Sequence, residues 1–201
     1  MKQIKYLMVA LTLLFIQPAF AHHGEDPNFA EYNVALGVSP FGGSLNFSHN
    51  ISHKTTYLAA VGGIDGIEMD LGIDGTDYTV GSKSAWVGFF VNHRPFKNAS
   101  WFRVVGGVGF GSIENELTDA DGNRYRADYN DNPVGYFGVG FGAGTDKGFS
   151  IGFDIGTLYT SGPDVSQVDG LENKAAVESI SNHFFFGSVL PNAQLTLGWG
   201  F

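Results

Sequence analysis

The last eight residues, Gln194-Leu-Thr-Leu-Gly-Trp-Gly-Phe201, alternate between two kinds of side chain. Every second residue from Leu195 to Phe201 is large and apolar, and the residues between them are Gln, Thr and Gly. A period of two is that of a β-strand, whose successive side chains point to opposite faces. The stretch therefore predicts a strand with one apolar face and one small, polar face.

The same alternation recurs along the chain, so the terminal strand is one of many. It is clear at Phe102–Phe110, Tyr136–Phe141 and Phe149–Gly156, and weaker at Tyr32–Val38, Leu45–Phe47, Tyr57–Ile64 and Tyr78–Val91. Together with the last strand these segments give about eight strands, separated by turn-forming residues. The sequence predicts an all-β protein.

Two features favour a membrane barrel over a soluble sandwich, which would also alternate. The polar faces carry mostly Gly, Ser, Thr and Asn, which suit the narrow interior of a small barrel. The chain also ends in mid-strand on Leu197, Trp199 and Phe201, as in the C-terminal sorting signal that the barrel-assembly machinery reads, although Thr196 stands where that signal has glycine. We expect an eight-stranded antiparallel up-and-down transmembrane β-barrel.

Composition narrows the protein class further. The 201 residues include 29 glycines and no cysteine, which excludes disulfide scaffolds and cysteine-ligated metal sites. The net charge of −9 argues against nucleic-acid binding. Residues 1–21 have two lysines, an apolar run and Ala19-Phe-Ala21, and so predict a cleaved signal peptide. We expect a flexible segment over residues 22–30 and the barrel over residues 31–201, in the outer membrane of a Gram-negative bacterium.

The connections between the strands alternate in length and in charge. Asn50–Lys54, Arg94–Ser100 and Gly144–Gly148 are short, as expected of periplasmic turns, and Ile64–Asp77, Glu114–Asp131 and Ser161–His183 are long, as expected of extracellular loops. The long segments hold most of the acidic residues, and we predict an acidic mouth formed by Asp65, Glu68, Asp70, Asp74, Asp77, Asp119 and Asp121. Such a mouth would either concentrate cationic solutes or bind ions at the lipopolysaccharide surface.

Four segments together resemble the CarO-type outer-membrane proteins: Gly75–Tyr78, Trp86–Phe96, Asn132–Phe141 and Leu158–Ser166. The resemblance covers most of the chain after residue 21 in strand order and loop placement. It implies an eight-stranded barrel with a largely filled lumen. It also implies a role in the uptake of ornithine and other basic amino acids, and in carbapenem susceptibility.

Charged residues on the polar faces are candidate lumen residues. The alternation places Arg103 and Asp154 inward, on strands that are not neighbours, so they could meet only across the lumen or through other polar groups. They form either a structural ion pair or a constriction that selects solutes by charge. On the fourth strand Trp86 and Arg94 share the inward parity, unless a bulge or a swapped face changes it.

Other motifs are weaker candidates for chemistry. His22 and His23 could chelate a metal at a free terminus. Asp119–Asn123 resembles half of a calcium loop but lacks its glutamate, which favours a β-turn. Ser181 and His183 show no converging orienting acid for a hydrolase. We therefore expect no enzyme activity, no cofactor and no metal site.

The sequence predicts a monomeric, narrow and passive channel for small polar solutes, best suited to cationic amino acids such as ornithine. The expected partners are outer-membrane lipid, lipopolysaccharide, the barrel-assembly machinery and small cationic solutes. The alternative is a structural or adhesive barrel whose acidic loops bind ions or lipopolysaccharide and which conducts little, because eight strands enclose little more than their own side chains.

Overall fold

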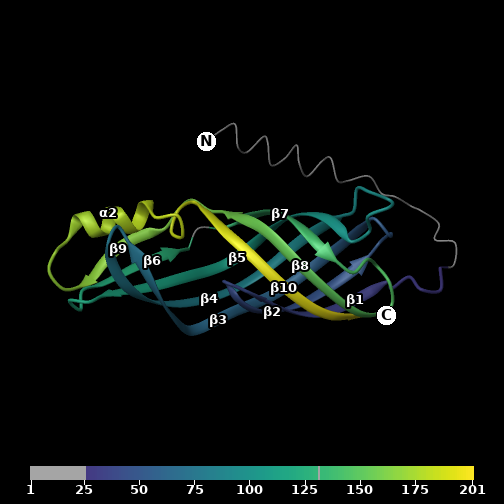
Figure 1. The fold of residues 1–201 in the computed structure, drawn as a ribbon, viewed down its shortest axis with the longest axis horizontal. Helices are drawn as coiled ribbons and strands as arrows, with labels where there is room; N and C mark the ends of the chain where they lie inside the picture. Colours follow the sequence, from purple (N-terminus) through teal and green to yellow (C-terminus); the bar gives the residue numbers. More distant parts are fainter. Residues whose placement is uncertain (1–25, 131) are drawn as a thin grey trace.

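The computed structural model describes residues 26–130 and 132–201, and over these residues eight strands close into a ring (Figure 1). Neighbours around the ring pair antiparallel in the order β4, β3, β2, β1, β10, β8, β7, β5, and pairing of β4 with β5 closes it. The strands are β1 (Tyr32–Ser39), β2 (Gly42–Asn50), β3 (Thr55–Ile73), β4 (Thr76–His93), β5 (Phe102–Asp119), β7 (Val134–Gly142), β8 (Gly148–Tyr159) and β10 (Val189–Gly200). The predicted eight-stranded up-and-down barrel is confirmed.

The outer surface of the ring is apolar. Large side chains alternate outward along its strands with between about four and seven tenths of their surface exposed, among them Leu36, Val38, Leu45, Phe47, Val61, Phe89, Phe149, Ile151, Phe153, Leu195 and Leu197. Water would penalise an apolar area of this size, whereas hydrocarbon chains accommodate it. The predicted sorting residues Leu197, Trp199 and Phe201 lie on this outer surface, each about half exposed.

No helix among the described residues is long and apolar enough to cross a membrane.

The segments predicted as long loops are largely strand and helix, which corrects the sequence analysis. β3, β4 and β5 continue beyond the ring, and β6 (Arg124–Tyr129) and β9 (Asp164–Asp169) extend the sheet, followed by α2 (Lys174–Asn182). We call residues 66–82, 112–129 and 164–186 the extension. The prediction failed because β6 pairs with β9, a contact between distant segments that alternation within one segment does not reveal.

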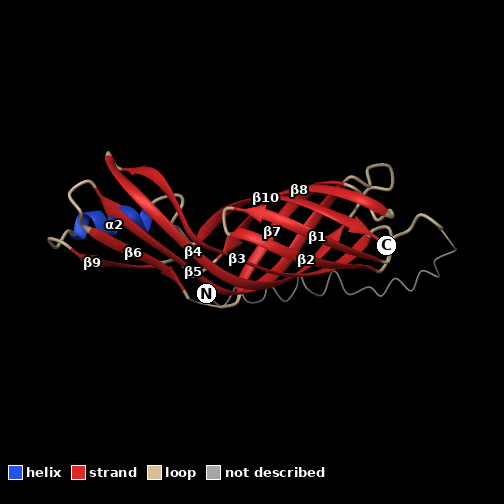
Figure 2. Ribbon diagram, turned by 90° about the horizontal axis from the view of Figure 1, so that it is seen from below, coloured by secondary structure: helices blue, strands red, loops and turns tan. Residues whose placement is uncertain are grey.

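The extension has a hydrophobic core of its own. One face of its sheet carries Tyr78, Val80, Leu117 and Tyr125, and α2 covers this face with Ala176 and Ile180 (Figure 2). Leu117, Tyr125 and Ile180 have no exposed surface. Asn173 caps the helix by accepting a hydrogen bond from the Ala176 amide at 3.1 Å. The extension is therefore a packed unit at one end of the barrel.

The opposite end of the barrel, which we call the turn end, has the predicted short connections. Residues 26–30 lie across this end. The Ala30 amide donates a hydrogen bond to the Thr145 carbonyl at 2.8 Å, and the Lys147 amide donates one to the Asn28 carbonyl at 2.8 Å. Asn50 Nδ2 donates to the Ala30 carbonyl at 2.8 Å. This part of the segment predicted to be flexible thus has specific partners. The predicted signal peptide, His22 and His23 lie outside the described residues.

Replacing Leu117 by alanine should loosen the extension and leave the barrel closed. The change removes a fully buried side chain, which costs about 2–5 kcal/mol in a well-packed core. Trypsin should then cleave faster after Arg124 and Arg126, which lie on β6. The matched control, Leu195→Ala on the outer surface of the barrel, should cleave at the wild-type rate. Equal cleavage rates in both variants would show that the extension has no cooperative core.

Candidate functional site: the barrel lumen

Large inward side chains lie against glycines of the barrel wall. A methyl group at Gly62 would meet the Trp86 ring at 2.5 Å, and one at Gly156 would meet the Tyr136 hydroxyl at 2.6 Å. At Gly37 it would meet Gln194 Nε2 at 2.5 Å. These glycines thus leave space along the wall for the long inward side chains. This packing keeps space open in a barrel whose interior is normally just filled by side chains.

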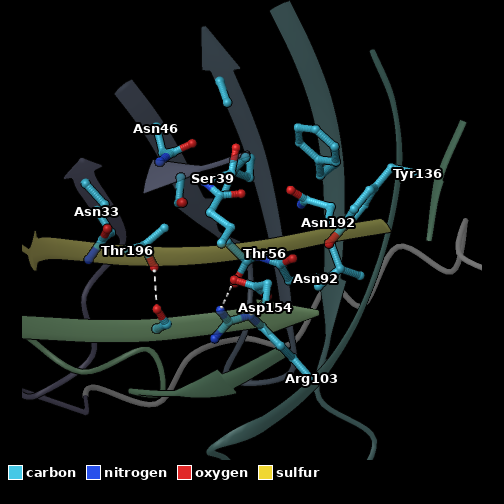
Figure 3. Close-up of a pocket in the computed structure, with 18 of the residues that line it drawn as sticks. Asn33, Ser39, Asn46, Thr56, Asn92, Arg103, Tyr136, Asp154, Asn192 and Thr196 are labelled. Atoms are coloured by element: carbon cyan, nitrogen blue, oxygen red, sulfur yellow. Dashed lines mark hydrogen bonds and ion pairs between the residues drawn. The ribbon is translucent and has the colours of Figure 1, made fainter. Parts of the chain in front are cut away.

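Arg103 and Asp154 form an ion pair inside the barrel (Figure 3). Arg103 Nη2 donates to Asp154 Oδ2 at 2.7 Å, and Nε donates to Oδ1 at 3.1 Å. The two residues lie on β5 and β8, with β7 between them, and both are in register with Gly140. A side chain at Gly140 would clash with both groups, so the pair spans β7 over a glycine. The predicted inward placement matches this geometry, and the contact follows the wall rather than crossing the lumen.

The other polar groups of the lumen form short hydrogen-bonded chains. Gln194 Nε2 donates to Ser44 Oγ at 3.2 Å, and Thr196 Oγ1 donates to the Gly152 carbonyl at 3.2 Å. Asn33 Nδ2 donates to Ser150 Oγ at 2.9 Å. The Thr196 bond joins neighbouring strands, whereas the Gln194 and Asn33 bonds reach across β1 and β10 respectively, so the polar lining also ties the ring together. The sequence analysis placed Gln194 and Thr196 on the polar face of the last strand but named none of these residues as lumen candidates, although their inward parity would have identified them.

The fourth strand of the ring faces inward as its parity predicted. Trp86 Nε1 donates to the Phe41 carbonyl at 3.1 Å, at the end of the lumen nearest the extension. Arg94, just after β4, lies at the turn end with 5% of its surface exposed and donates from Nη1 to Thr56 Oγ1 at 3.1 Å. The structure thus places all four predicted lumen residues, Arg103, Asp154, Trp86 and Arg94, along one cavity.

The cavity has a volume of about 190 Å³. It has room for several water molecules, because a cavity needs only on the order of 15 Å³ of such free space to hold one. Its lining reaches from Thr145 and Asp146 at the turn end to Phe41 and Ser112 beside the extension. Between these ends, Asn, Ser, Thr and Gln side chains provide hydrogen-bonding groups for a polar solute.

The chain is similar in fold to CarO. The crystal structure of CarO from Acinetobacter baumannii matches with a TM-score of 0.67 and 17% identity, over 86% of this chain and 98% of CarO. CarO2 from the same organism matches with a TM-score of 0.68 and 17% identity, over 86% of this chain and 99% of CarO2. No family model and no curated protein matches the sequence. The likeness to CarO therefore shows a shared barrel fold, with the chain spanning nearly the whole of each neighbour.

The acidic residues predicted to form a mouth lie away from the lining of the cavity. Asp65 pairs with Lys83 just outside the extension, and Glu68 and Asp70 pair with Gly81 and Thr79 on the face of the extension opposite its core. Asp77 shares that face, and Asp74 lies in the β3–β4 turn. Asp119 and Asp121 lie at the β5–β6 turn. None of the seven lines the cavity. These acidic residues lie away from the cavity because β3, β4 and β5 continue as a sheet beyond the ring.

Local contacts perturb the acidity of two aspartates in the extension. Arg124 donates from Nη2 to Asp169 Oδ2 at 3.0 Å, and this hydrogen bond lowers the pKa of Asp169. Partial burial raises the pKa of Asp128, and the charges of Glu114 and Asp164 add to this effect. Among the described residues no group of three or more His, Asp or Glu side chains is close enough to hold a metal ion.

The two remaining motifs have structural partners. Asp119 Oδ1 accepts hydrogen bonds from the amides of Asp121 and Asn123 at 3.0 and 2.9 Å, as in the β-turn that the sequence favoured. Ser181 Oγ donates to the Val177 carbonyl within α2 at 2.7 Å. His183 lies against the rings of Phe185 and Phe186. This arrangement gives no support to a serine nucleophile activated by histidine.

Replacing Asp154 by asparagine should destabilise the barrel by about 3 kcal/mol. The change leaves the largely buried Arg103 guanidinium without its counter-charge, and removing one partner of a buried pair costs about 3–5 kcal/mol, least where water is near. Guanidinium titration in lipid vesicles measures the free energy of unfolding. The double variant Arg103→Met/Asp154→Leu should regain most of the loss, and the exposed control Asp164→Asn should lose little. Wild-type stability in Asp154→Asn would contradict a stabilising pair.

Proposed function

We propose that this protein is an outer-membrane barrel that lets small polar solutes pass through its lumen by diffusion. The outward apolar band and the eight-stranded ring support residence in a membrane. The fold likeness to CarO supports a general role among outer-membrane barrels. We orient the barrel with the turn end toward the periplasm and the extension toward the outside, because outer-membrane barrels have short connections on the periplasmic side and long ones on the outside.

The observation that carries the proposal is the lumen cavity, in which amide and hydroxyl groups lie among apolar side chains. Its lining includes residues from both ends of the barrel, and combines glycines and small polar side chains with aromatic and aliphatic ones. A solute entering this cavity exchanges water for the amide and hydroxyl groups of Asn46, Ser48, Asn92 and Thr196. The Arg103–Asp154 pair is one of the charged features that a solute meets in this cavity.

The lumen gives no reason to prefer cations. The cavity is lined by two arginines, Arg94 and Arg103, and by two aspartates, Asp146 and Asp154. The acidic residues of the extension face away from its core and do not line the path. The expected attraction of cationic amino acids at an acidic mouth therefore has no geometric support, and the proposal covers small polar solutes in general.

A second candidate function is adhesion, and the extension favours it. The extension is a packed unit that no diffusion path requires, and it exposes large apolar side chains: Leu171 is 86% exposed and Phe184 is 68% exposed. Exposed apolar residues on a rigid support are typical of contact surfaces. In this reading the lumen conducts little and the extension binds another surface.

Planar-bilayer recordings separate the two functions. Purified wild-type protein should give single-channel steps, and liposomes containing it should take up glycerol and small amino acids. Asn46→Phe places a ring in the lumen, where Asn46 is 3% exposed, and should abolish the steps. The adjacent Leu45→Phe, on the outer surface, is the matched control and should conduct normally. Silent wild-type protein without uptake would exclude the channel and leave adhesion.

A further inference from the structure

The second guanidinium of the lumen lacks a counter-charge. Arg94 is 5% exposed and lines the cavity at the turn end. Its Nη1 donates to Thr56 Oγ1 at 3.1 Å, but its buried Nε has no hydrogen-bond partner among the described residues. A buried donor without an acceptor is costly, and a buried charge is more so. The environment of Arg94 is therefore incomplete without a further acceptor.

The neighbouring charged residues do not supply this acceptor for Arg94. Asp154 is already bound to Arg103 by two hydrogen bonds. The charges of Asp146 and Asp154 attract Arg94 and that of Arg103 repels it, but among the described carboxylates none comes within 4.0 Å of Arg94 to form an ion pair. The two lumen arginines thus differ: the protein neutralises Arg103 and leaves Arg94 open to the cavity.

A chain of hydrogen bonds fixes the position of the Arg94 side chain. Thr56 accepts from Arg94 and donates to Asn50 Oδ1 at 2.6 Å, and Asn50 Nδ2 donates to the Ala30 carbonyl at 2.8 Å. Thr56 is 3% exposed and Asn50 is 6% exposed, so the chain is held inside the protein. A guanidinium fixed on one side offers its remaining N–H groups in a constant direction.

We propose that Arg94 is the binding site for a small carboxylate inside the lumen. A planar guanidinium matches the two oxygens of a carboxylate better than it matches a spherical ion, because two parallel N–H···O bonds can form. The cavity volume of about 190 Å³ admits a carboxylate of a few heavy atoms together with water. This inference rests on the proposed function: it identifies small carboxylates as a solute class that the lumen holds on its way through.

Acetate is the probe for the test. Calorimetric titration of the purified full chain in detergent with sodium acetate should give saturable binding. Arg94→Gln should weaken it by at least about tenfold, the effect of losing a charged hydrogen bond. Arg94→Lys, which keeps the charge but loses the fork, should weaken it as well. Arg126→Gln, on the exposed face of β6, is the matched control and should bind like the wild type.

A spectroscopic measurement on the wild-type protein tests the site even if the Arg94→Gln variant fails to fold. In protein labelled with ¹⁵N-arginine, the Arg94 Nε–H signal should shift on addition of acetate and remain in place on addition of chloride. No saturable acetate shift, equal shifts with chloride, or wild-type affinity in both Arg94 variants would overturn the site. If acetate binds but the protein gives no single-channel steps in bilayers, conduction is refuted and the Arg94 site is not. If the protein conducts but does not bind acetate, the site is refuted and conduction is not.

Discussion

The lumen depends on one constraint: its large inward side chains must pack against glycines in the strands of the barrel. Eight strands enclose little volume, yet this barrel holds Trp86, Tyr136 and an Arg103–Asp154 pair and still keeps a cavity of about 190 Å³. That is possible because Gly62, Gly140 and Gly156 have no Cβ where those groups lie. The abundance of glycine in the sequence therefore serves packing in the lumen as well as turns.

Alternation along the sequence was enough to predict the ring and the side of the wall on which each residue lies. Arg103 and Asp154 were placed inward because their neighbours in sequence are apolar and face outward. Their contact could not be predicted, since it depends on register across β7 and on Gly140. The extension was missed for a related reason: charged or small residues alternate with Tyr78, Val80 and Leu117, and the buried face appears only once β6, β9 and α2 pack together.

The distribution of charge follows from the same architecture. The sequence is strongly acidic, with a net charge of −9, and its linear pattern suggested an acidic entrance. The structure separates the two features, because the acidic residues lie on the outer face and at the turns of the extension, while the cavity is lined by Arg94, Arg103, Asp146 and Asp154. Under the proposed function, solute choice is therefore a property of the lumen, where burial strengthens each electrostatic contact.

The central claim is that the lumen is a continuous aqueous path, and the cysteine-free sequence allows a direct measurement. Single cysteines at Ser48 and Thr196 face the cavity, and one at Leu197 faces outward. A small, water-soluble thiosulfonate should modify both lumen cysteines in vesicles whether it is added inside or outside, and should leave the cysteine at Leu197 largely unmodified. Modification from one side only, or of neither lumen cysteine, would show a closed barrel and contradict the account.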